Sequence, residues 1–330
     1  MIKTKIAGVG YYVPEQVITN QDLEQRIDTS NEWIVSRSGI EERRWVRDGI
    51  CTSDLAFEAS KKAMKAAKVS SEDIDLVIVG TITSDYFFPG VSAQLQDRLD
   101  LHHIGAFDVK AACSAFIYAL SIGDQFIRTG VCSTILIVGA EVQSKFLNIS
   151  TEGRDMTVLF GDGSGAAILQ KSDDESGILS THLHCQGANI KDLWMEAPGS
   201  AENCQMTNIK LEEGRHFPLM NGREVFRNAV VRFPEVIQES LDASGLTLDD
   251  VNLIIPHQAN LRISQAVAKR LGVGMDKVFS NIHKYGNTTA ASIPIALCEA
   301  VEEKKISKGD VVVLASFGAG FTWASAAIRW

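Results

Sequence analysis

The chain has 330 residues, of which 45% are hydrophobic and 22% are charged, and its formal net charge is −9 at pH 7. This length exceeds what one hydrophobic core usually organises, so two domains or a duplicated fold is expected. The negative charge argues against a nucleic-acid-binding protein at the level of the whole chain.

In chain order, the first half alternates helix-like and strand-like segments. Residues 53–68 predict a helix that leads into the apolar strand 73–79, and residues 113–128 predict a second helix that leads into the strand 134–138. Because these strands are continuous apolar runs, helices should cover both faces of a mostly parallel sheet. The helix predicted at 113–128 is apolar nearly all round, which indicates a buried helix.

The second half repeats this order. The helix-like segment 224–244 leads into the strand 250–256, and the helix-like segment 288–303 leads into the strand 311–315. Corresponding strands lie a constant 177 residues apart, since 250 − 73 and 311 − 134 give the same value. This repeat predicts a duplicated α/β fold in which two sheets enclose the buried helices and further helices lie outside, five layers in all.

The repeat divides the chain into an N-terminal half, 1–170, and a C-terminal half, 171–330. Segments 141–160 and 180–221 have no counterpart in the other half, and we interpret them as cap or dimer insertions. The uncharged stretch 311–328 is divided by glycine and hydroxyl residues, so a buried hairpin is expected there rather than a membrane-spanning helix.

The cysteine pattern bears on the redox compartment. There is no Cys-x-x-Cys pair and most cysteines lie in apolar runs, so reduced thiols in a cytoplasmic protein are expected rather than a disulfide framework. The N-terminal segment has only a short apolar stretch and no small-residue cleavage site, which does not fit a secretory signal peptide. The six cysteines are Cys51, Cys113, Cys132, Cys185, Cys204 and Cys298.

Cys113 is the first candidate catalytic residue. It follows the short strand 107–109 and opens the first buried helix, where the helix dipole and free N–H groups favour a thiolate. A thiolate there can attack a thioester or another acyl donor. The alternative is that Cys113 is a small core residue, as most buried cysteines are.

His257 and Asn287 are polar residues at element boundaries in apolar sequence. His257 follows the strand 251–255, and ligands bind at the carboxyl ends of strands in α/β sheets, although a structural histidine is the alternative. Asn287 begins the second buried helix, in the repeat position closest to Cys113. It can cap that helix, face the same cavity as Cys113, or do both.

Two other patterns are weaker. The glycine-rich runs 161–165 and 318–320 match neither phosphate-loop pattern, although a tight turn at 318–320 would suit an oxyanion hole. His182 and His184 have no second ligand pair at a useful spacing, so no zinc site and no other metal site is expected.

Several long motifs, in order, resemble β-ketoacyl-acyl-carrier-protein synthase III, the thiolase-fold enzyme that starts bacterial type II fatty acid synthesis. The resemblance runs from the first strand to the terminal Trp330. The motifs are Asp-Thr-Ser-Asn-Glu-Trp-Ile at 28–34, Ala-Ala-Cys-Ser at 111–114, Phe-Gly-Asp-Gly at 160–163, Pro-His-Gln-Ala-Asn-Leu-Arg at 256–262, Gly-Asn-Thr at 286–288 and Phe-Gly-Ala-Gly-Phe-Thr-Trp at 317–323.

The resemblance implies a decarboxylating condensation of acetyl-CoA, or another short acyl-CoA, with malonyl-acyl-carrier-protein. Cys113 would carry the acyl group, and the N–H groups of Cys113 and Ala319 would form the oxyanion hole. His257 and Asn287 would donate hydrogen bonds to the enolate oxygen that decarboxylation leaves. The products would be 3-oxoacyl-acyl-carrier-protein, CoA and CO₂, and no cofactor is implied beyond these substrates.

Trp33 would stack on the CoA adenine, with Arg37 and Arg154 near the phosphates. The competing local interpretation is that Thr29 and Glu32 form a capping box and that Trp33 only packs on this short helix.

The resemblance also implies a docking surface for the acidic carrier protein. Arg262, Lys269 and Arg270 share one predicted helix and could attract that protein, or they could form an ordinary solvated face. A homodimer is likewise implied.

Phe88 matches the position that closes the acyl pocket from the partner subunit, and Phe317 belongs to the same pocket. A bulky ring at position 88 predicts short primers such as acetyl. Three positions depart from the family pattern: Ala115 and Lys110 beside the nucleophile, and Ala319 in the glycine turn. The first two bear on the acyl pocket and the thiol environment rather than on the reaction class.

Other functions fit part of these observations. A same-fold acyltransferase or condensing enzyme of secondary metabolism would use a different primer or acceptor. A Cys-His-Asn hydrolase of the cysteine-protease type would use the same three residues, although their deep apolar setting disfavours peptide substrates. A non-catalytic binding or structural protein is the remaining class, and neither a nucleic-acid nor a membrane partner is expected.

Overall fold

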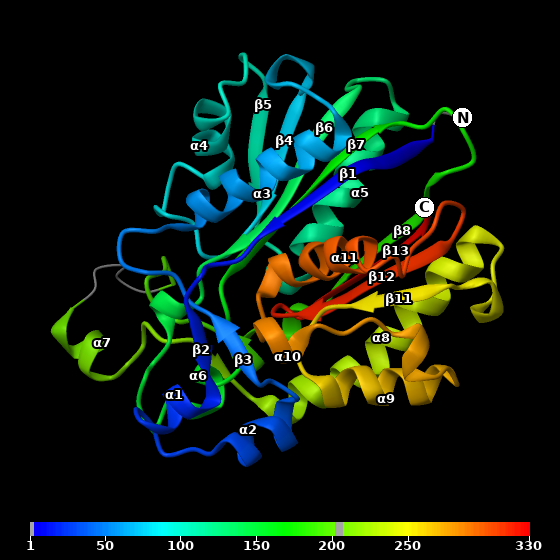
Figure 1. Cartoon of the computed structure of the whole chain (residues 1–330). Helices are drawn as coiled ribbons and strands as arrows, with labels where there is room; N and C mark the ends of the chain where they lie inside the picture. The colour runs from blue at the N-terminus through cyan, green and yellow to red at the C-terminus, as the bar shows by residue number, and fades with distance from the viewer. Residues whose placement is uncertain (1–2, 202–206) are drawn as a thin grey trace.

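Two mixed β-sheets form the frame of the molecule in the computed structural model, which describes residues 3–201 and 207–330 (Figure 1). The five-stranded sheet has the order β1-β7-β6-β4-β5, and the four-stranded sheet has the order β11-β12-β13-β8. β4 runs parallel to β5 and β6, and β11 runs parallel to β12, whereas the other neighbours are antiparallel. The strands are β1 (Thr4–Tyr12), β4 (Leu76–Gly80), β5 (Gly105–Val109), β6 (Thr134–Glu141), β7 (Gly163–Lys171), β8 (Gly177–Cys185), β11 (Leu253–Pro256), β12 (Val311–Gly318) and β13 (Thr322–Arg329).

Two helices, α5 (Ala115–Arg128) and α11 (Ser292–Glu302), form a central layer between the sheets (Figure 1). Their side chains, Phe116 and Leu297 among them, share one apolar core with residues of both sheets. Both helices are apolar on nearly every side because each faces a sheet on two sides. The predicted buried layer is confirmed.

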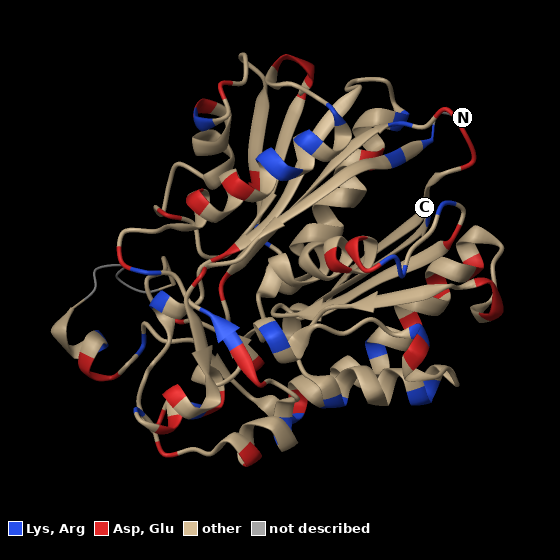
Figure 2. Ribbon diagram, in the orientation of Figure 1, with Lys and Arg blue, Asp and Glu red and all other residues tan. Residues whose placement is uncertain are grey.

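Further helices cover the outer faces. α3 (Thr52–Ala67) and α4 (Val91–Arg98) pack on the five-stranded sheet, and α8 (Gly222–Ser244) and α9 (Leu261–Leu271) pack on the four-stranded sheet. Charged residues lie mostly on these outer helices and on the loops (Figure 2). The duplicated five-layer α/β architecture is therefore confirmed. Within the described ranges, no helix is long and apolar enough to cross a membrane.

The duplication extends to the register of the strands. Leu76 of β4 pairs with Ile135 of β6, and Leu253 of β11 pairs with Val312 of β12, so both partners are shifted by the predicted 177 residues. Ala290 is the residue of the C-terminal half that corresponds to Cys113 in the repeat, because 290 − 113 is 177. Asn287 precedes that position by three residues, so it is not the counterpart of Cys113.

Both buried helices begin with an unusual turn. A 3₁₀ turn, η2 (Ala112–Ser114), precedes α5, and η7 (Thr289–Ala291) precedes α11. Ala112 has a φ of 45° and its repeat counterpart Thr289 has a φ of 50°. Such angles are uncommon for residues with a side chain, so the shared geometry is a feature of the duplicated fold.

Some predicted boundaries change. The uncharged stretch 311–328 forms the hairpin β12–β13, as predicted. The insertion predicted to start at residue 180 starts later, because residues 180–185 belong to β8, the edge strand of the second sheet. The insertion predicted at 141–160 likewise starts after Glu141, because Glu141 ends β6 and corresponds to Gly318 at the end of β12. Cys204 lies outside the described residues, and the other five cysteines are free.

The remaining elements lie to one side of the layers. Arg43 of β3 is fully buried there and donates hydrogen bonds to the carbonyl oxygens of Ile18 and Val158 and to Asn20 Oδ1. Since a buried guanidinium needs such partners, Arg43 holds β2, the first residue of α1 and the residue after α6 against β3. All the remaining elements are short. They are α1 (Asn20–Glu24), α2 (Asn31–Ser38), β2 (Val17–Thr19), β3 (Glu42–Arg44), α6 (Arg154–Thr157), β9 (Leu193–Trp194), α7 (Asn208–Glu212), β10 (Leu219–Met220) and α10 (Ile282–Tyr285).

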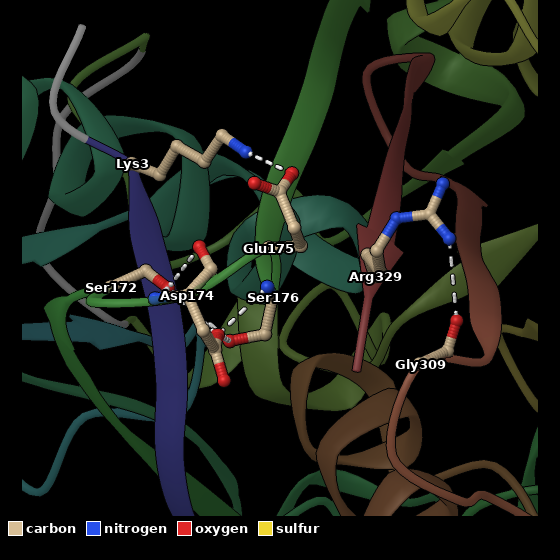
Figure 3. A network of polar contacts seen from close by, with 7 residues as sticks. All are labelled: Lys3, Ser172, Asp174, Glu175, Ser176, Gly309 and Arg329. Carbon is tan, nitrogen blue, oxygen red and sulfur yellow. Dashed lines mark hydrogen bonds and ion pairs between the residues drawn. The ribbon is translucent and has the colours of Figure 1, made fainter.

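Polar contacts fix the turn that joins the two sheets, between β7 and β8 (Figure 3). Lys3 Nζ lies 2.8 Å from Glu175 Oε2, and the backbone N–H of Ser172 donates to the Lys3 carbonyl oxygen. Asp174 accepts hydrogen bonds from the N–H and hydroxyl groups of Ser176. These groups are largely exposed, so each contact contributes little to stability, and their main effect is to define the path of the turn.

Candidate active site

Cys113 lies in η2, between β5 and α5, and only 7% of it is exposed. The backbone N–H groups of Cys113 and Ala319 both donate towards its sulfur. Gly318 passes directly over the thiol, since a Cβ atom at this position would lie 2.6 Å from the Cys113 Cβ and 2.8 Å from its Sγ. The turn at 318–320 therefore needs glycine at its first position, and it brings a second N–H donor to the nucleophile.

The pKa of the Cys113 thiol is higher than its position at a helix start suggests. Burial, with a smaller contribution from the Glu141 carboxylate, raises the pKa of Cys113 to about 12, and the two N–H groups oppose this rise. The expectation that the helix terminus favours a thiolate is wrong for the free enzyme, because desolvation outweighs the N–H groups. The resting residue is a thiol that must lose its proton when it attacks.

His257 follows the last residue of β11, and its backbone N–H donates to the Ala315 carbonyl oxygen at 2.8 Å. Its Nδ1 lies 2.5 Å from Ser292 Oγ, at the first residue of α11. The same hydroxyl accepts the backbone N–H of Gln258 at 3.4 Å, which directs the hydroxyl proton towards Nδ1. We assign the imidazole proton to Nε2 on this hydrogen-bond network.

The imidazole is neutral and keeps a free donor. Burial lowers the pKa of His257 to about 3. Nε2 is buried and has no hydrogen-bond partner in the described part of the chain. A buried N–H without a partner costs free energy, so its presence indicates a site shaped for an incoming acceptor.

Asn287 follows Gly286, whose φ is 62°, and is 7% exposed. Its Oδ1 accepts the backbone N–H of Thr289, two residues on, at 2.9 Å. The predicted N-cap role is wrong, because Thr288 is the N-cap of η7 and no side chain of the described residues caps that start. Asn287 Nδ2 donates to no group of residues 3–201 or 207–330, which leaves this N–H₂ group for a ligand. The carboxamide oxygen therefore fixes a local turn, while the N–H₂ group stays open to the cavity.

Cys113, His257 and Asn287 line one cavity of about 150 Å³. Phe317, predicted to share the acyl pocket with Phe88, lines this cavity and does not line the second, larger one. The other walls are mostly apolar, and residues of β9, β10 and α8 contribute to them without having been predicted. They are Leu193, Met220, Val225, Phe226 and Ala229.

A larger cavity of about 550 Å³ meets Cys113 from another side. Ala319 and Lys110 line it, and Lys110 is the single charged residue among the described residues that do so. Ala115 is fully buried and packs on β4, since a Cβ at Gly80 would come within 2.8 Å of the Ala115 Cβ. The two residues beside the nucleophile that depart from the family pattern thus have different surroundings. Ala115 makes a tight contact in the core, and Lys110 lines the larger cavity.

The three residues predicted to bind CoA lie together. The guanidinium of Arg154 lies 4.5 Å from the centroid of the Trp33 ring, and that of Arg37 lies 5.8 Å from it. Asn260 connects them to the smaller cavity, because its Nδ2 donates to the Arg37 carbonyl oxygen while the residue itself lines that cavity. A flat ring flanked by two cations suits an aromatic, phosphate-bearing ligand.

The helix that carries Trp33 is capped differently from the prediction. Ser30 is the N-cap, and its hydroxyl accepts the Trp33 backbone N–H at 3.1 Å. The proposed Thr29–Glu32 capping box is wrong, since Thr29 Oγ1 is buried without a partner in the described chain. The predicted start was one residue early.

The three predicted docking residues, Arg262, Lys269 and Arg270, are all exposed on α9. Ile263 of the same helix lines the smaller cavity, so this basic surface adjoins the site. Arg262 lies over the Phe226 ring at 5.9 Å, and Arg270 donates to the Val230 carbonyl oxygen.

Phe88 lines neither cavity of its own chain and is 80% exposed, next to Phe87 at 85% and Tyr86 at 62%. The loop that carries these rings is nevertheless held firmly. Asp85 accepts hydrogen bonds from the N–H and hydroxyl groups of Ser53, and Asp108 accepts those from the first N–H groups of α4. A well-anchored loop that presents aromatic rings to solvent is typical of an interface.

Comparisons with known proteins agree with this geometry. The family model described as 3-oxoacyl-[acyl-carrier-protein (ACP)] synthase III matches residues 107–187, and the model of its C-terminal part matches residues 241–330. The chain is 47% identical over 329 residues to beta-ketoacyl-[acyl-carrier-protein] synthase III of Xanthomonas campestris, covering 100% of this chain and 99% of that protein. It is 45% identical over 331 residues to the enzyme of the same name from Xylella fastidiosa, with the same coverage of both chains.

Solved structures give the same result. The crystal structure of 3-oxoacyl-[acyl-carrier-protein] synthase III from Aquifex aeolicus superposes with a TM-score of 0.91 at 42% identity, covering 99% of this chain and 100% of that chain. The fold and the site together define a thiolase-fold condensing enzyme, an acyltransferase. The chain belongs to the β-ketoacyl-[acyl-carrier-protein] synthase III family.

Proposed function

We propose that the protein condenses acetyl-CoA, or another short acyl-CoA, with malonyl-acyl-carrier-protein, and so starts fatty acid elongation. The observation that carries the proposal is that a nucleophilic thiol, a neutral imidazole N–H and an amide N–H₂ open into one apolar cavity. Each of the two steps of the reaction needs hydrogen-bond donors aimed at a developing negative charge.

In the first step, the Cys113 thiol gives up its proton and its sulfur attacks the thioester carbon of the acyl-CoA. The carbonyl oxygen becomes an oxyanion that the N–H groups of Cys113 and Ala319, which converge on the sulfur, would stabilise. The C–S bond to CoA then breaks, and the CoA thiolate leaves and takes up a proton. Because the cavity walls are apolar, they favour the uncharged acyl-enzyme over a Cys113 thiolate.

In the second step, malonyl-acyl-carrier-protein loses CO₂, and the electrons of the broken C–C bond move into an enolate. His257 Nε2–H and Asn287 Nδ2–H would both donate to the enolate oxygen. Neutral donors suit this role because they stabilise the oxygen without readily protonating the carbon. The enolate carbon attacks the acyl-Cys113 carbonyl, and Cys113 leaves as a thiolate that recovers a proton.

The hydrolase alternative conflicts with the hydrogen bonds. In a Cys-His-Asn protease the asparagine orients the histidine. Here His257 Nδ1 forms a hydrogen bond with the Ser292 hydroxyl, and Asn287 Oδ1 accepts the backbone N–H of Thr289. Relatives at 45–47% identity over the full chain also support a fatty acid synthase component over a secondary-metabolism enzyme.

The remaining assignments form part of the same proposal. Trp33, Arg37 and Arg154 would hold the nucleotide end of CoA, and Arg262, Lys269 and Arg270 would meet the acidic carrier protein. The two guanidinium groups beside the Trp33 ring support the first role, and the shared position on α9 supports the second. The chemistry needs no metal or cofactor, since the substrates supply every leaving group.

We further propose that the protein is a cytoplasmic homodimer. Within each chain, the N-terminal and C-terminal halves divide near residue 170. The exposed, anchored Phe88 loop supports the dimer, in which Phe88 of one protomer would close the larger cavity of the other and limit the primer to short chains. β7 and β8 lie in different sheets, which supports the division, and five free cysteines suit a reducing compartment.

The proposal is tested by incubating the enzyme with acetyl-CoA and malonyl-acyl-carrier-protein and following released CO₂ and the acyl-carrier-protein product by mass spectrometry. Acetoacetyl-acyl-carrier-protein, free CoA and CO₂ should form in equal amounts. Acyl-Cys113 formed without any condensation product would favour the secondary-metabolism alternative.

A further inference from the structure

The duplication creates a second copy of the catalytic geometry, and this copy is chemically different. At the offset of 177 residues, Ala290 takes the place of Cys113, and Glu141 takes the place of Gly318. Around the first copy, the strand end must be glycine because the thiol lies directly against it. Around the second copy, the equivalent strand end carries a glutamate, and no thiol is present.

The Glu141 carboxylate occupies this second copy. It is 0% exposed, and the Ala290 N–H, the counterpart of the Cys113 N–H in the oxyanion hole, donates to it. The Thr83 hydroxyl donates to Oε2 at 2.6 Å, and the Ile82 N–H approaches both oxygens at 3.2 and 3.3 Å. A buried carboxylate thus fills an anion site that the duplication left without a substrate.

The groups that bind this carboxylate also shape the working site. Ile82 and Thr83 line the larger cavity with Cys113, and so does Thr289, the residue before Ala290. Thr83 also receives the Val142 N–H on its hydroxyl, and its carbonyl oxygen accepts the Thr52 hydroxyl. One carboxylate therefore ties together β4, β6 and the start of η7 beside the nucleophile.

The carboxylate also contributes charge. Titratable or charged groups face Cys113 from three elements: His257 after β11, Glu141 at the end of β6 and Lys110 after β5. The loop after β4 and η7 present hydroxyl and N–H groups to Glu141. Burial raises the pKa of Glu141 to about 8, against the opposing effect of these donors. Glu141 is consequently protonated well below pH 8 and ionised well above it.

We infer that Glu141 fills the disused second copy of the oxyanion site and acts as a positioning residue for Cys113. It does so by fixing the Ile82–Thr83 wall and, when ionised, by placing a negative charge near the thiol. This deepens the proposed function, which makes Cys113 the nucleophile. Its test, however, needs no acyl substrate, so failure of the condensation reaction and failure of this inference are distinguishable.

The test is the rate of Cys113 alkylation by iodoacetamide in the full-length enzyme between pH 6 and 9.5, followed by peptide mass spectrometry. Wild type and Glu141→Gln should react at similar rates near pH 6, where the carboxyl is protonated. Above pH 8 the ionised carboxylate disfavours the thiolate. A plot of the logarithm of the wild-type alkylation rate against pH should therefore bend to a lower slope there. Glu141→Gln should show no bend and react faster by roughly tenfold at pH 9.5, since one pH unit of thiol pKa is a tenfold change in thiolate.

Two further variants keep the inference falsifiable if Glu141→Gln folds poorly. Glu141→Asp retains the charge and should retain the bend. Thr83→Val removes a hydrogen bond that favours the ionised carboxylate, so the bend should move to higher pH. Superimposable profiles for wild type and Glu141→Gln, or a bend that stays in place in Thr83→Val, would overturn the inference.

Discussion

Ser292 Oγ lies 2.5 Å from His257 Nδ1, and the same hydroxyl accepts the Gln258 N–H. The serine begins α11 and the histidine follows β11, so the central helix layer sets the tautomer of a residue on the second sheet. This contact explains how a fully buried imidazole can present Nε2–H, rather than a lone pair, to the cavity that contains Cys113.

Removing this hydroxyl should therefore weaken decarboxylation more than acylation. We expect Ser292→Ala to lower the malonyl decarboxylation rate by roughly five- to tenfold, the effect of losing one hydrogen bond of about 1 to 1.4 kcal/mol. Transfer of acetyl from acetyl-CoA to Cys113 should change little. Ser240→Ala is the matched control, since its hydroxyl is equally buried but bonds to Ile237 on α8. Equal loss in both steps would contradict the tautomer role.

The close contact between Gly318 and the thiol makes a second prediction. A methyl group at position 318 would overlap both Cys113 Cβ and Sγ, and it must displace the nucleophile from the N–H groups. Gly318→Ala should lower the rate of Cys113 acylation by about 10²-fold, as misplacement of a reacting atom does. Single-turnover acylation measures this, and far-UV circular dichroism verifies the fold. Near-normal acylation would mean that the turn at 318–320 is not part of the oxyanion hole.

The depressed pKa of His257 predicts a pH dependence of stability. The unfolded chain binds a proton at His257 below about pH 6.5, whereas the folded chain does so only near pH 3. The free energy of unfolding therefore decreases as pH falls through this window. The Tm of wild type should fall more steeply from pH 6.5 to 4 than that of His257→Gln, which has no titrating group there. Parallel curves would show that the imidazole is not buried in its neutral form.

Phe88 provides a prediction about the primer. If this exposed ring closes the larger cavity of a partner protomer, Phe88→Ala should raise the rate with six- and eight-carbon acyl-CoA relative to acetyl-CoA. The rate with each primer, measured at fixed malonyl-acyl-carrier-protein, gives the comparison. Size-exclusion chromatography with light scattering should confirm that the variant remains a dimer. An unchanged primer preference in a dimeric variant would rule out the gate.

Much of the frame was predictable because strands buried on both faces carry a clear apolar signal. The 177-residue offset then related the halves, and the two buried helices followed from their uniform apolarity. Cys113, His257 and Asn287 stood out as polar interruptions of such sequence. The Thr29 cap was one residue early, because helix ends depend on local hydrogen bonds that sequence patterns place only approximately.

The proposed roles of Ser292 and Glu141 could not be predicted from the sequence, for a physical reason. Ser292 looks like an ordinary hydroxyl in a helix, and only the fold brings it to His257. Glu141 looks like the polar end of an apolar strand, although its offset from Gly318 was available as a signal. The ionisation of Cys113 was also misjudged, since the degree of burial, which dominates its pKa, is set by the tertiary structure.

In the proposed reaction Cys113 carries the acyl group, and His257 and Asn287 stabilise the enolate. The most direct measurement compares His257→Ala and Asn287→Ala with wild type in two assays, acetyl transfer from acetyl-CoA to Cys113 and CO₂ release from malonyl-acyl-carrier-protein. Each variant should still form the acetyl-enzyme, while CO₂ release should fall by about 10² to 10³ because one oxyanion donor is lost. Near-normal CO₂ release from both variants, with acyl transfer abolished, would contradict this division of roles.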